Sequence, residues 1–138
     1  MDGATRLAAR ELPPVPDRRR VAGQVPLAQE SHVRYLQLLS MGAKAHDSND
    51  TVKAAEYYRQ AIRMDAQQGE AKYLLSSILY NQGVDLYKAR NYTGARNHFR
   101  ESETLAADAT RDTDVQNESS GLLAQVRKAI QALNAQGL

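Results

Sequence analysis

The sequence predicts an all-α fold in which two similar helical hairpins and a closing helix follow an extended N-terminal arm. Residue types that favour helices are abundant, and all four prolines lie before residue 27. From residue 31 onward, apolar residues recur at spacings of three and four. An internal repeat is also present, in which a glycine is followed twelve residues later by an alanine and four further on by an aromatic residue. Its two copies are Gly42, Ala54 and Tyr58, and then Gly83, Ala95 and Phe99.

Length and composition limit the class of protein. With 138 residues, of which 42% are hydrophobic, the chain has material for one domain, and we predict a single helical domain over residues 31–138. The absence of cysteine excludes a disulfide framework and thiolate metal sites. No apolar run approaches the roughly 20 residues of a membrane span, and the N-terminus lacks the apolar core of a signal peptide. We therefore expect a cytoplasmic protein without a membrane span, with import into an organelle as an open alternative.

The formal net charge of +2 comes from the N-terminal segment. Residues 1–23 hold five arginines against three acidic residues, whereas the 13 basic and 13 acidic residues of the remaining chain cancel. Binding to a phosphate backbone requires clustered Lys and Arg that displace counterions. The neutral body argues against a nucleic-acid partner.

The first 30 residues predict a flexible arm. Proline fixes φ and removes a backbone donor, so a proline-rich segment is extended and does not join a packed helix. A short helix over residues 5–11 is possible before the prolines. Arg18, Arg19 and Arg20 lie between Pro16 and Pro26. These three side chains form either a docking signal or part of a solvated linker.

Five helices are expected after the arm. Ser31 is a suitable N-cap for a first helix over about 32–47, and the sequence DSND then forms a turn. A second helix runs over about 51–65, and a break at 67–69 precedes a third. A break at Arg90 and Asn91 precedes the fourth helix, over about 92–107. The final helix is expected to begin at residue 112 or 113, either of which is a suitable N-cap, and to end at about 134. Because it has one apolar face, we expect it to cover the exposed apolar surface at the end of the second hairpin.

The repeat resembles the tetratricopeptide repeat (TPR), a helix-turn-helix unit of about 34 residues. The first copy, over about 35–68, matches the family pattern with Leu38, Met41, Gly42, Ala45, Ala54, Tyr58, Ala61 and Ala66. The second copy, over about 76–109, matches it with Leu79, Gln82, Gly83, Leu86, Ala95, Phe99, Ser102 and Ala107. The resemblance implies a right-handed solenoid of two hairpins with a capping helix over about 113–134, and a role in binding other proteins.

Several positions depart from the TPR pattern. Leucine replaces the family's first tryptophan and alanine its final proline in both copies, and the glycines lie 41 residues apart where the family has 34. The additional seven residues are about two helical turns, which a longer third helix would absorb without rotating its faces. The segment KAAEYYRQAI also resembles the microtubule-interacting and trafficking domain, but this alternative explains only the first half of the body.

The sequence contains no pattern of catalytic residues. His32, His46 and His98 have no metal-ligand spacing, and no nucleophile elbow, phosphate loop or facing carboxylate pair is present. In the TPR proteins that bind acidic C-terminal tails, Lys, Arg and Asn line the inner helices; only Asn81 matches that set here. We therefore predict a protein that is not an enzyme, binds no cofactor or metal and does not capture a terminal carboxylate.

Tyr73, Tyr80 and Tyr87 recur every seven residues along the third helix, with Val84 between them. Either this stripe packs against the first helix of the neighbouring hairpin, or it lines an apolar groove. The groove would contain Leu36, Leu39, Ala43, Tyr73, Tyr80, Val84 and Tyr87. The expected core residues are Tyr58, Ile62, Leu75, Leu79, Leu86, Phe99, Val126 and Ile130.

The groove predicts an adaptor or chaperone-like module that binds a peptide or an amphipathic helix of a protein partner. The alternative is a structural subunit of a larger multiprotein assembly, docked through its arm. A homo- or hetero-oligomer is compatible with both.

Overall fold

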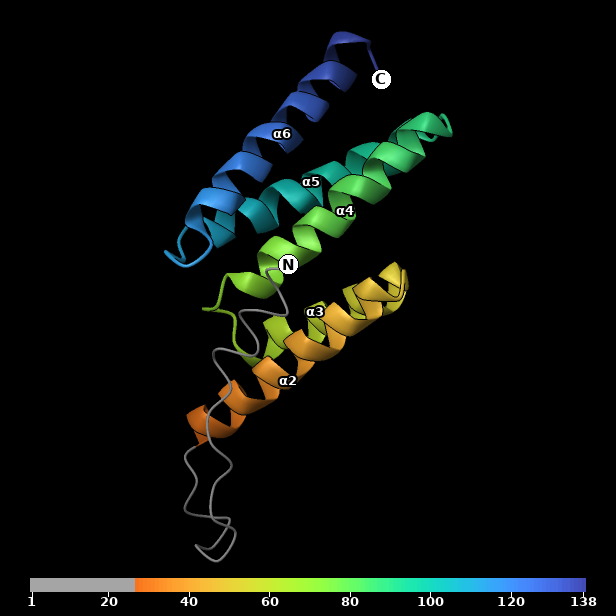
Figure 1. Ribbon diagram of the computed structural model, residues 1–138. Helices are drawn as coiled ribbons and strands as arrows, with labels where there is room; N and C mark the ends of the chain where they lie inside the picture. Colours follow the sequence, from red (N-terminus) through yellow and green to blue (C-terminus); the bar gives the residue numbers. More distant parts are fainter. Residues whose placement is uncertain (1–26) are drawn as a thin grey trace, which may run out of the picture. The chain divides into compact units, whose positions relative to one another are not determined.

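The computed structural model describes residues 27–138, which form five helices and no strand (Figure 1). The all-α fold class is confirmed. The helices are α2 (Leu27–Asp47), α3 (Thr51–Met64), α4 (Glu70–Lys88), α5 (Tyr92–Ala109) and α6 (Gln116–Ala135). They belong to two compact units, an N-terminal unit that ends at Gln67 and a C-terminal unit, Gln68–Leu138. The predicted docking residues Arg18, Arg19 and Arg20 lie outside the described residues.

Helix α2 begins at Leu27, five residues before the predicted start, so the last four residues of the predicted arm are helical. A proline disfavours helical structure in the residue before it but not in those after it. The sequence prediction instead ended the arm at residue 30 and placed the cap of the first helix at Ser31. Both the helix start and the arm boundary were therefore predicted too late in the sequence.

The turn between α2 and α3 satisfies the free carbonyls of α2 and starts α3 without an additional loop. Asn49 adopts a positive φ of 61°, its N–H donates to the carbonyl of His46, and the N–H of Asp50 donates to that of Ala45 over 2.9 Å. This is the Schellman pattern of a helix C-terminus. The Asp50 side chain accepts a hydrogen bond from the Lys53 N–H over 3.0 Å and so caps α3.

The turn between α4 and α5 repeats this geometry 41 positions later. Arg90 has a positive φ of 64°, and the Asn91 N–H donates to the Leu86 carbonyl over 2.8 Å. The Asn91 side chain accepts from the Gly94 N–H over 3.0 Å. Because each turn residue has its counterpart at the same offset as the glycines, the internal repeat extends from the sequence to the backbone conformation.

Each hairpin also contains the same close approach between its two helices. A Cβ atom added to Gly42 would lie 2.4 Å from the Tyr58 ring, and one added to Gly83 would lie 2.6 Å from the Phe99 ring. Both rings are buried. The glycine of each copy therefore leaves space for the aromatic ring that lies four residues after the alanine of the same copy.

The segment between α5 and α6 differs from the prediction. Helix α6 starts at Gln116, after the predicted cap at residue 112 or 113. Asp112 instead contacts the start of α4. Its carboxylate accepts a hydrogen bond of 2.7 Å from the N–H of Gly69, at the N-terminus of α4. The interaction is favourable because a helix N-terminus carries free N–H groups and a partial positive charge.

The core of the C-terminal unit lies between α5 and α6, with α4 against the same cluster. Its buried members are Ala95, Phe99, Ala106, Leu122, Val126 and Leu133. Among the predicted core residues of the whole chain, Tyr58, Leu75, Leu79, Phe99 and Val126 are buried. The remaining three are half-buried; they are Ile62, Leu86 and Ile130.

Candidate binding pocket

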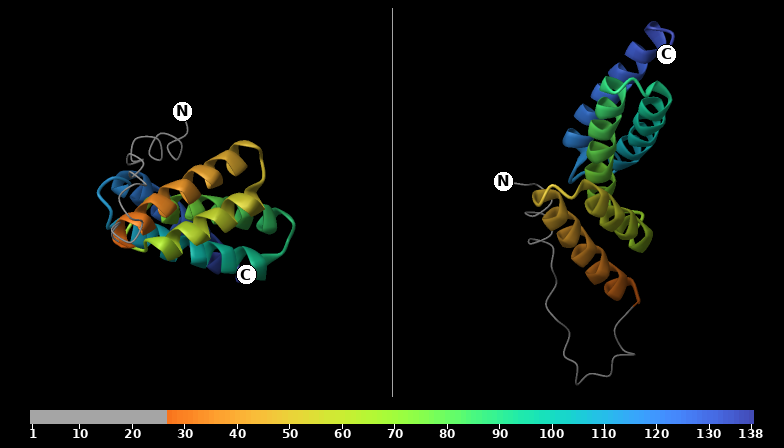
Figure 2. Two further views of the ribbon diagram at one scale, coloured as in Figure 1. Left: turned by 90° about the horizontal axis from the view of Figure 1, so that it is seen from below. Right: turned by 90° about the vertical axis from the view of Figure 1, so that its right-hand side faces the viewer.

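Helices α4 and α6 both pack beside α5, which runs antiparallel to them; Figure 2 shows this three-helix unit from two further directions. Their N-terminal ends are close to each other. A Cβ atom on Gly69 would lie 2.6 Å from Asp112 and 2.9 Å from Val115, directly before α6. One turn later, burial and the nearby Glu118 carboxylate raise the pKa of Tyr73 above its ordinary value of 10.0. At this end, therefore, the start of α4 is in close contact with the segment directly before α6.

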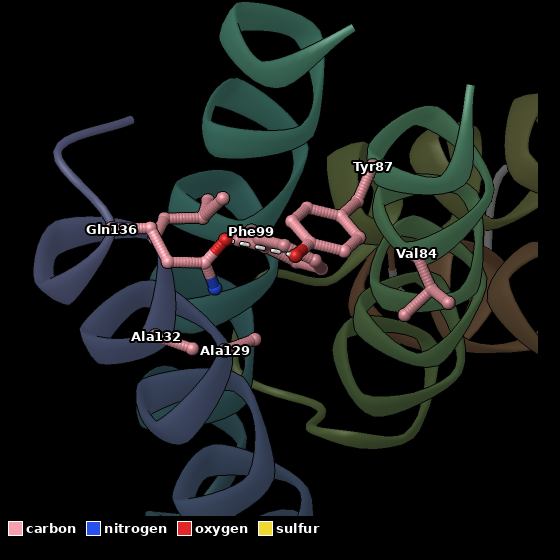
Figure 3. Close-up of a pocket in the computed structure, with 7 residues that line it drawn as sticks. Val84, Tyr87, Phe99, Ala129, Ala132 and Gln136 are labelled. Atoms are coloured by element: carbon pink, nitrogen blue, oxygen red, sulfur yellow. Dashed lines mark hydrogen bonds between the residues drawn. The ribbon is translucent and has the colours of Figure 1, made fainter. Parts of the chain in front are cut away.

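Toward their C-terminal ends the same helices enclose an apolar pocket of about 200 Å³ (Figure 3). Helices α4 and α6 form its walls, and Phe99 of α5 lies between them. The lining residues are Val84, Tyr87, Phe99, Ala129, Ala132, Leu133 and Gln136. The alanines on α6 determine its size, because a larger side chain at 129 or 132 would occupy the space between the helices. An apolar cavity of about 150 Å³ is large enough for a benzene ring, so this pocket can hold one large apolar side chain.

Tyr87 crosses the opening of the pocket. Its hydroxyl donates a hydrogen bond of 3.0 Å to the Oε1 of Gln136, which connects α4 to α6 (Figure 3). Its ring packs edge to face on Tyr92 at a centroid distance of 5.6 Å. The side chain is nevertheless 36% exposed. Tyr87 and Gln136 are therefore the polar groups that an incoming ligand would meet first.

Polar contacts on the other side of α6 fix this helix to α5. The Arg96 guanidinium donates to Asn134 over 2.7 Å and also to the carbonyl of Leu138. Arg127 forms a salt bridge of 3.2 Å with Glu103. These contacts attach α6 to α5, whereas the hydrogen bond between Tyr87 and Gln136 joins it to α4.

Of the predicted groove, only Val84 and Tyr87 line the pocket. Tyr73 and Tyr80 are half-buried and pack against the core cluster of their own unit, with the Tyr80 ring 5.7 Å from that of Phe99. Both interpretations of the tyrosine stripe assigned it a contact with the first hairpin or with a ligand. Neither included this contact with the core cluster of α5 and α6. The side chain of Tyr87 is the most exposed of the stripe.

Leu36, Leu39 and Ala43, the other predicted groove residues, lie on α2 in the N-terminal unit. Their side chains are 1%, 0% and 1% exposed, so they present no surface to a ligand. The sequence prediction also missed the contribution of Ala132 and Gln136 on α6. Their spacing with Ala129 and Leu133, at three, four and seven residues, was the available signal for one continuous face.

The described residues offer little for other chemistry. Within residues 27–138, no three His, Cys, Asp or Glu side chains are grouped so that they could hold a metal ion. The buried Ser76 and Ser102 hydroxyls lie 2.9 Å apart and each donates to a carbonyl of the facing helix, so both serve the α4–α5 contact. No helix between residues 27 and 138 combines the length and apolar character that crossing a membrane requires.

Comparisons with known proteins leave the pocket as the main guide to function. No protein-family model matches the chain, and neither the curated proteins nor the solved structures include a significant match.

Proposed function

We propose that this chain is a non-enzymatic protein-interaction module of the TPR-like class, and that the pocket between α4 and α6 binds an apolar side chain of a peptide or amphipathic helix. The observation that carries the proposal is the pocket itself, about 200 Å³ in volume and lined by apolar side chains from three helices. The repeated hairpin geometry supports the TPR-like class, because the same turn and the same glycine-to-ring contact recur at one offset.

An amphipathic helix suits the pocket better than a compact polar ligand. The polar groups at the opening are the Tyr87 hydroxyl and the Gln136 amide, which already satisfy each other. A polar ligand gains little by exchanging that hydrogen bond for one of its own, whereas an apolar anchor gains free energy from the burial of its surface. Aromatic and aliphatic anchors that enter a pocket beside exposed tyrosines are typical of helix-in-groove recognition.

The test uses the ¹⁵N-labelled full chain and a panel of amphipathic peptides that share one apolar face with leucine or phenylalanine anchors. Binding should shift the amide resonances of Val84, Tyr87 and Ala132 more than those of the N-terminal unit. The variant Ala132→Trp fills the pocket and should weaken binding at least tenfold. Ala124→Trp is the matched control, because Ala124 is also exposed on α6 but does not line the pocket.

Two results would contradict the proposal. One is that the peptides shift no pocket resonance at millimolar concentration. The other is that Ala132→Trp and Ala124→Trp weaken binding equally, which would place the contact on the outer surface of α6. Circular dichroism of both variants establishes that their helical content is unchanged.

A further inference from the structure

The C-terminal unit has an unequal distribution of charge along its length. The end that contains the pocket comprises residues 81–100 and 125–138, which hold six basic residues and one acidic residue, a surplus of five positive charges. The opposite end comprises residues 68–80 and 101–124, which hold seven acidic and two basic residues, a surplus of five negative charges. The basic residues of the pocket end are Lys88, Arg90, Arg96, Arg100, Arg127 and Lys128, and its acidic residue is Asp85.

This separation of charge between the two ends is larger than the stabilisation of the helix termini requires. The pocket end holds the C-termini of α4 and α6 and the N-terminus of α5, while the other end holds the reverse. Each helix terminus carries about half an elementary charge, so two C-termini and one N-terminus leave about half a negative charge at the pocket end. A surplus of five positive charges is about ten times what would offset it. Capping therefore does not account for the basic character of this end.

Two of these cations lie one helical turn from a lining residue of the pocket, one on each wall. Lys88 follows the lining residue Val84 by four positions on α4, and Lys128 precedes the lining residue Ala132 by four positions on α6, so each shares a helix face with a lining residue. Both side chains are exposed. Within residues 27–138, neither ammonium group has a carboxylate partner. Arg96 and Arg127, by contrast, already bind groups of their own unit.

We infer that the partner of this pocket is an acidic amphipathic helix, which inserts an apolar anchor between α4 and α6 and places carboxylates against Lys88 and Lys128. The inference rests on the proposed function and adds the charge of the partner. Charge complementarity at the rim of an interface mainly raises the association rate and the selection against basic competitors. The same charge argument disfavours the chain's own residues 1–23 as the occupant of the pocket, because they carry a surplus of two positive charges.

The experiment compares three peptides that have identical apolar faces and whose polar faces are built from Glu, Gln or Lys. Fluorescence anisotropy with the full chain at about 50 mM and 300 mM salt measures each affinity. The Glu peptide should bind at least tenfold more tightly than the Gln peptide at low salt, the Lys peptide should bind more weakly still, and high salt should reduce the differences. The double variant Lys88→Glu/Lys128→Glu should remove the advantage of the Glu peptide. Lys53→Glu/Arg111→Glu makes the same change in net charge at exposed positions that do not line the pocket and should retain the advantage within twofold.

The outcomes separate this inference from the proposed function. If all three peptides bind equally and Ala132→Trp abolishes binding, the pocket function stands and the acidic partner is wrong. If none binds up to 1 mM, both are wrong. If the control pair loses as much affinity as the Lys88 and Lys128 pair, the attraction is non-specific and the inference is overturned. Salt-dependent self-association in light scattering, or tighter binding to an RNA oligomer or to anionic vesicles than to the Glu peptide, would identify a different occupant and also overturn it.

Discussion

The close approach of α4 to Phe99 gives a prediction in which two known effects have opposite signs. Replacing an interior helical glycine by alanine stabilises a helix by about 1 kcal/mol when there is space for the methyl group. At Gly83, however, the new Cβ would lie 2.6 and 2.7 Å from two atoms of the Phe99 ring. Forcing a methyl group into a packed core costs about 1–3 kcal/mol.

We expect the steric cost to be larger, so that Gly83→Ala lowers the free energy of unfolding by about 1 kcal/mol. The Phe99 ring is 3% exposed and has the Tyr80 ring against it, so it cannot move aside into solvent. The control is Gly121→Ala on α6. A Cβ there meets no atom within 4 Å, and that variant should gain the full propensity term of about 1 kcal/mol.

A double-mutant cycle identifies the cause. In a Phe99→Leu background the ring atoms are gone, and Gly83→Ala should become stabilising by up to about 1 kcal/mol, a coupling energy of about 2 kcal/mol. Urea unfolding followed by circular dichroism at 222 nm gives the free energies, and hydrogen exchange of the α4 amides assigns them to the C-terminal unit. If Gly83→Ala stabilises the wild-type chain as much as Gly121→Ala does, the proposed contact with the ring is wrong.

Three further predictions concern the same unit. Asp112→Ala removes the hydrogen bond to the Gly69 N–H and should cost about 1–2 kcal/mol in urea unfolding, and Asp112→Asn, which keeps an acceptor, should recover part of the loss. The pKa of Tyr73 is raised in the folded chain, so its contribution to stability is complete below pH 10 and is lost as the pH rises through that raised pKa. A Tyr73→Phe chain should therefore resist alkaline unfolding better. An unchanged midpoint of alkaline unfolding would contradict this. Tyr80→Ser should lower the melting temperature clearly, since it removes a ring from the Phe99 contact, whereas the exposed Tyr87→Ser should change it little; equal effects would show that the two rings have equivalent environments.

The features predicted well from the sequence are those decided by neighbouring residues. Helix periodicity, the turn at DSND, the break at Arg90 and Asn91 and the glycine-to-aromatic spacing depend on groups within a few turns or on a repeated local pattern. The expected third helix also starts close to the observed α4, at Glu70. These signals are present in the sequence itself because the interacting groups are close along it or occur twice in it.

The features predicted poorly depend on residues brought together by the fold. Asp112 looked like the cap of the helix that follows it, but its carboxylate binds Gly69, 43 residues earlier. The tyrosine stripe was identified, but periodicity shows only that a helix has an apolar face and not which neighbour covers it. The pocket was missed for the same reason, since its α6 wall contains alanines whose importance lies in the space that they leave.

The charge of the C-terminal unit shows why a total can conceal a local field. Its eight basic and eight acidic residues cancel, as do the charges of the whole chain after residue 23, whose neutral sum was the sequence argument against a nucleic-acid partner. The sequence in fact alternates between basic and acidic stretches: 88–100 is basic, 101–118 is acidic and 127–128 is basic again. Because α5 runs antiparallel to α4 and α6, folding places most basic residues in the half of the unit that contains the pocket and most acidic residues in the other half. Arg127 and Glu103 form a salt bridge where the two halves meet. A field of this kind acts within about a Debye length, roughly 8–10 Å at physiological salt, so a partner at the pocket opening responds to Lys88 and Lys128 and not to the sum over the chain.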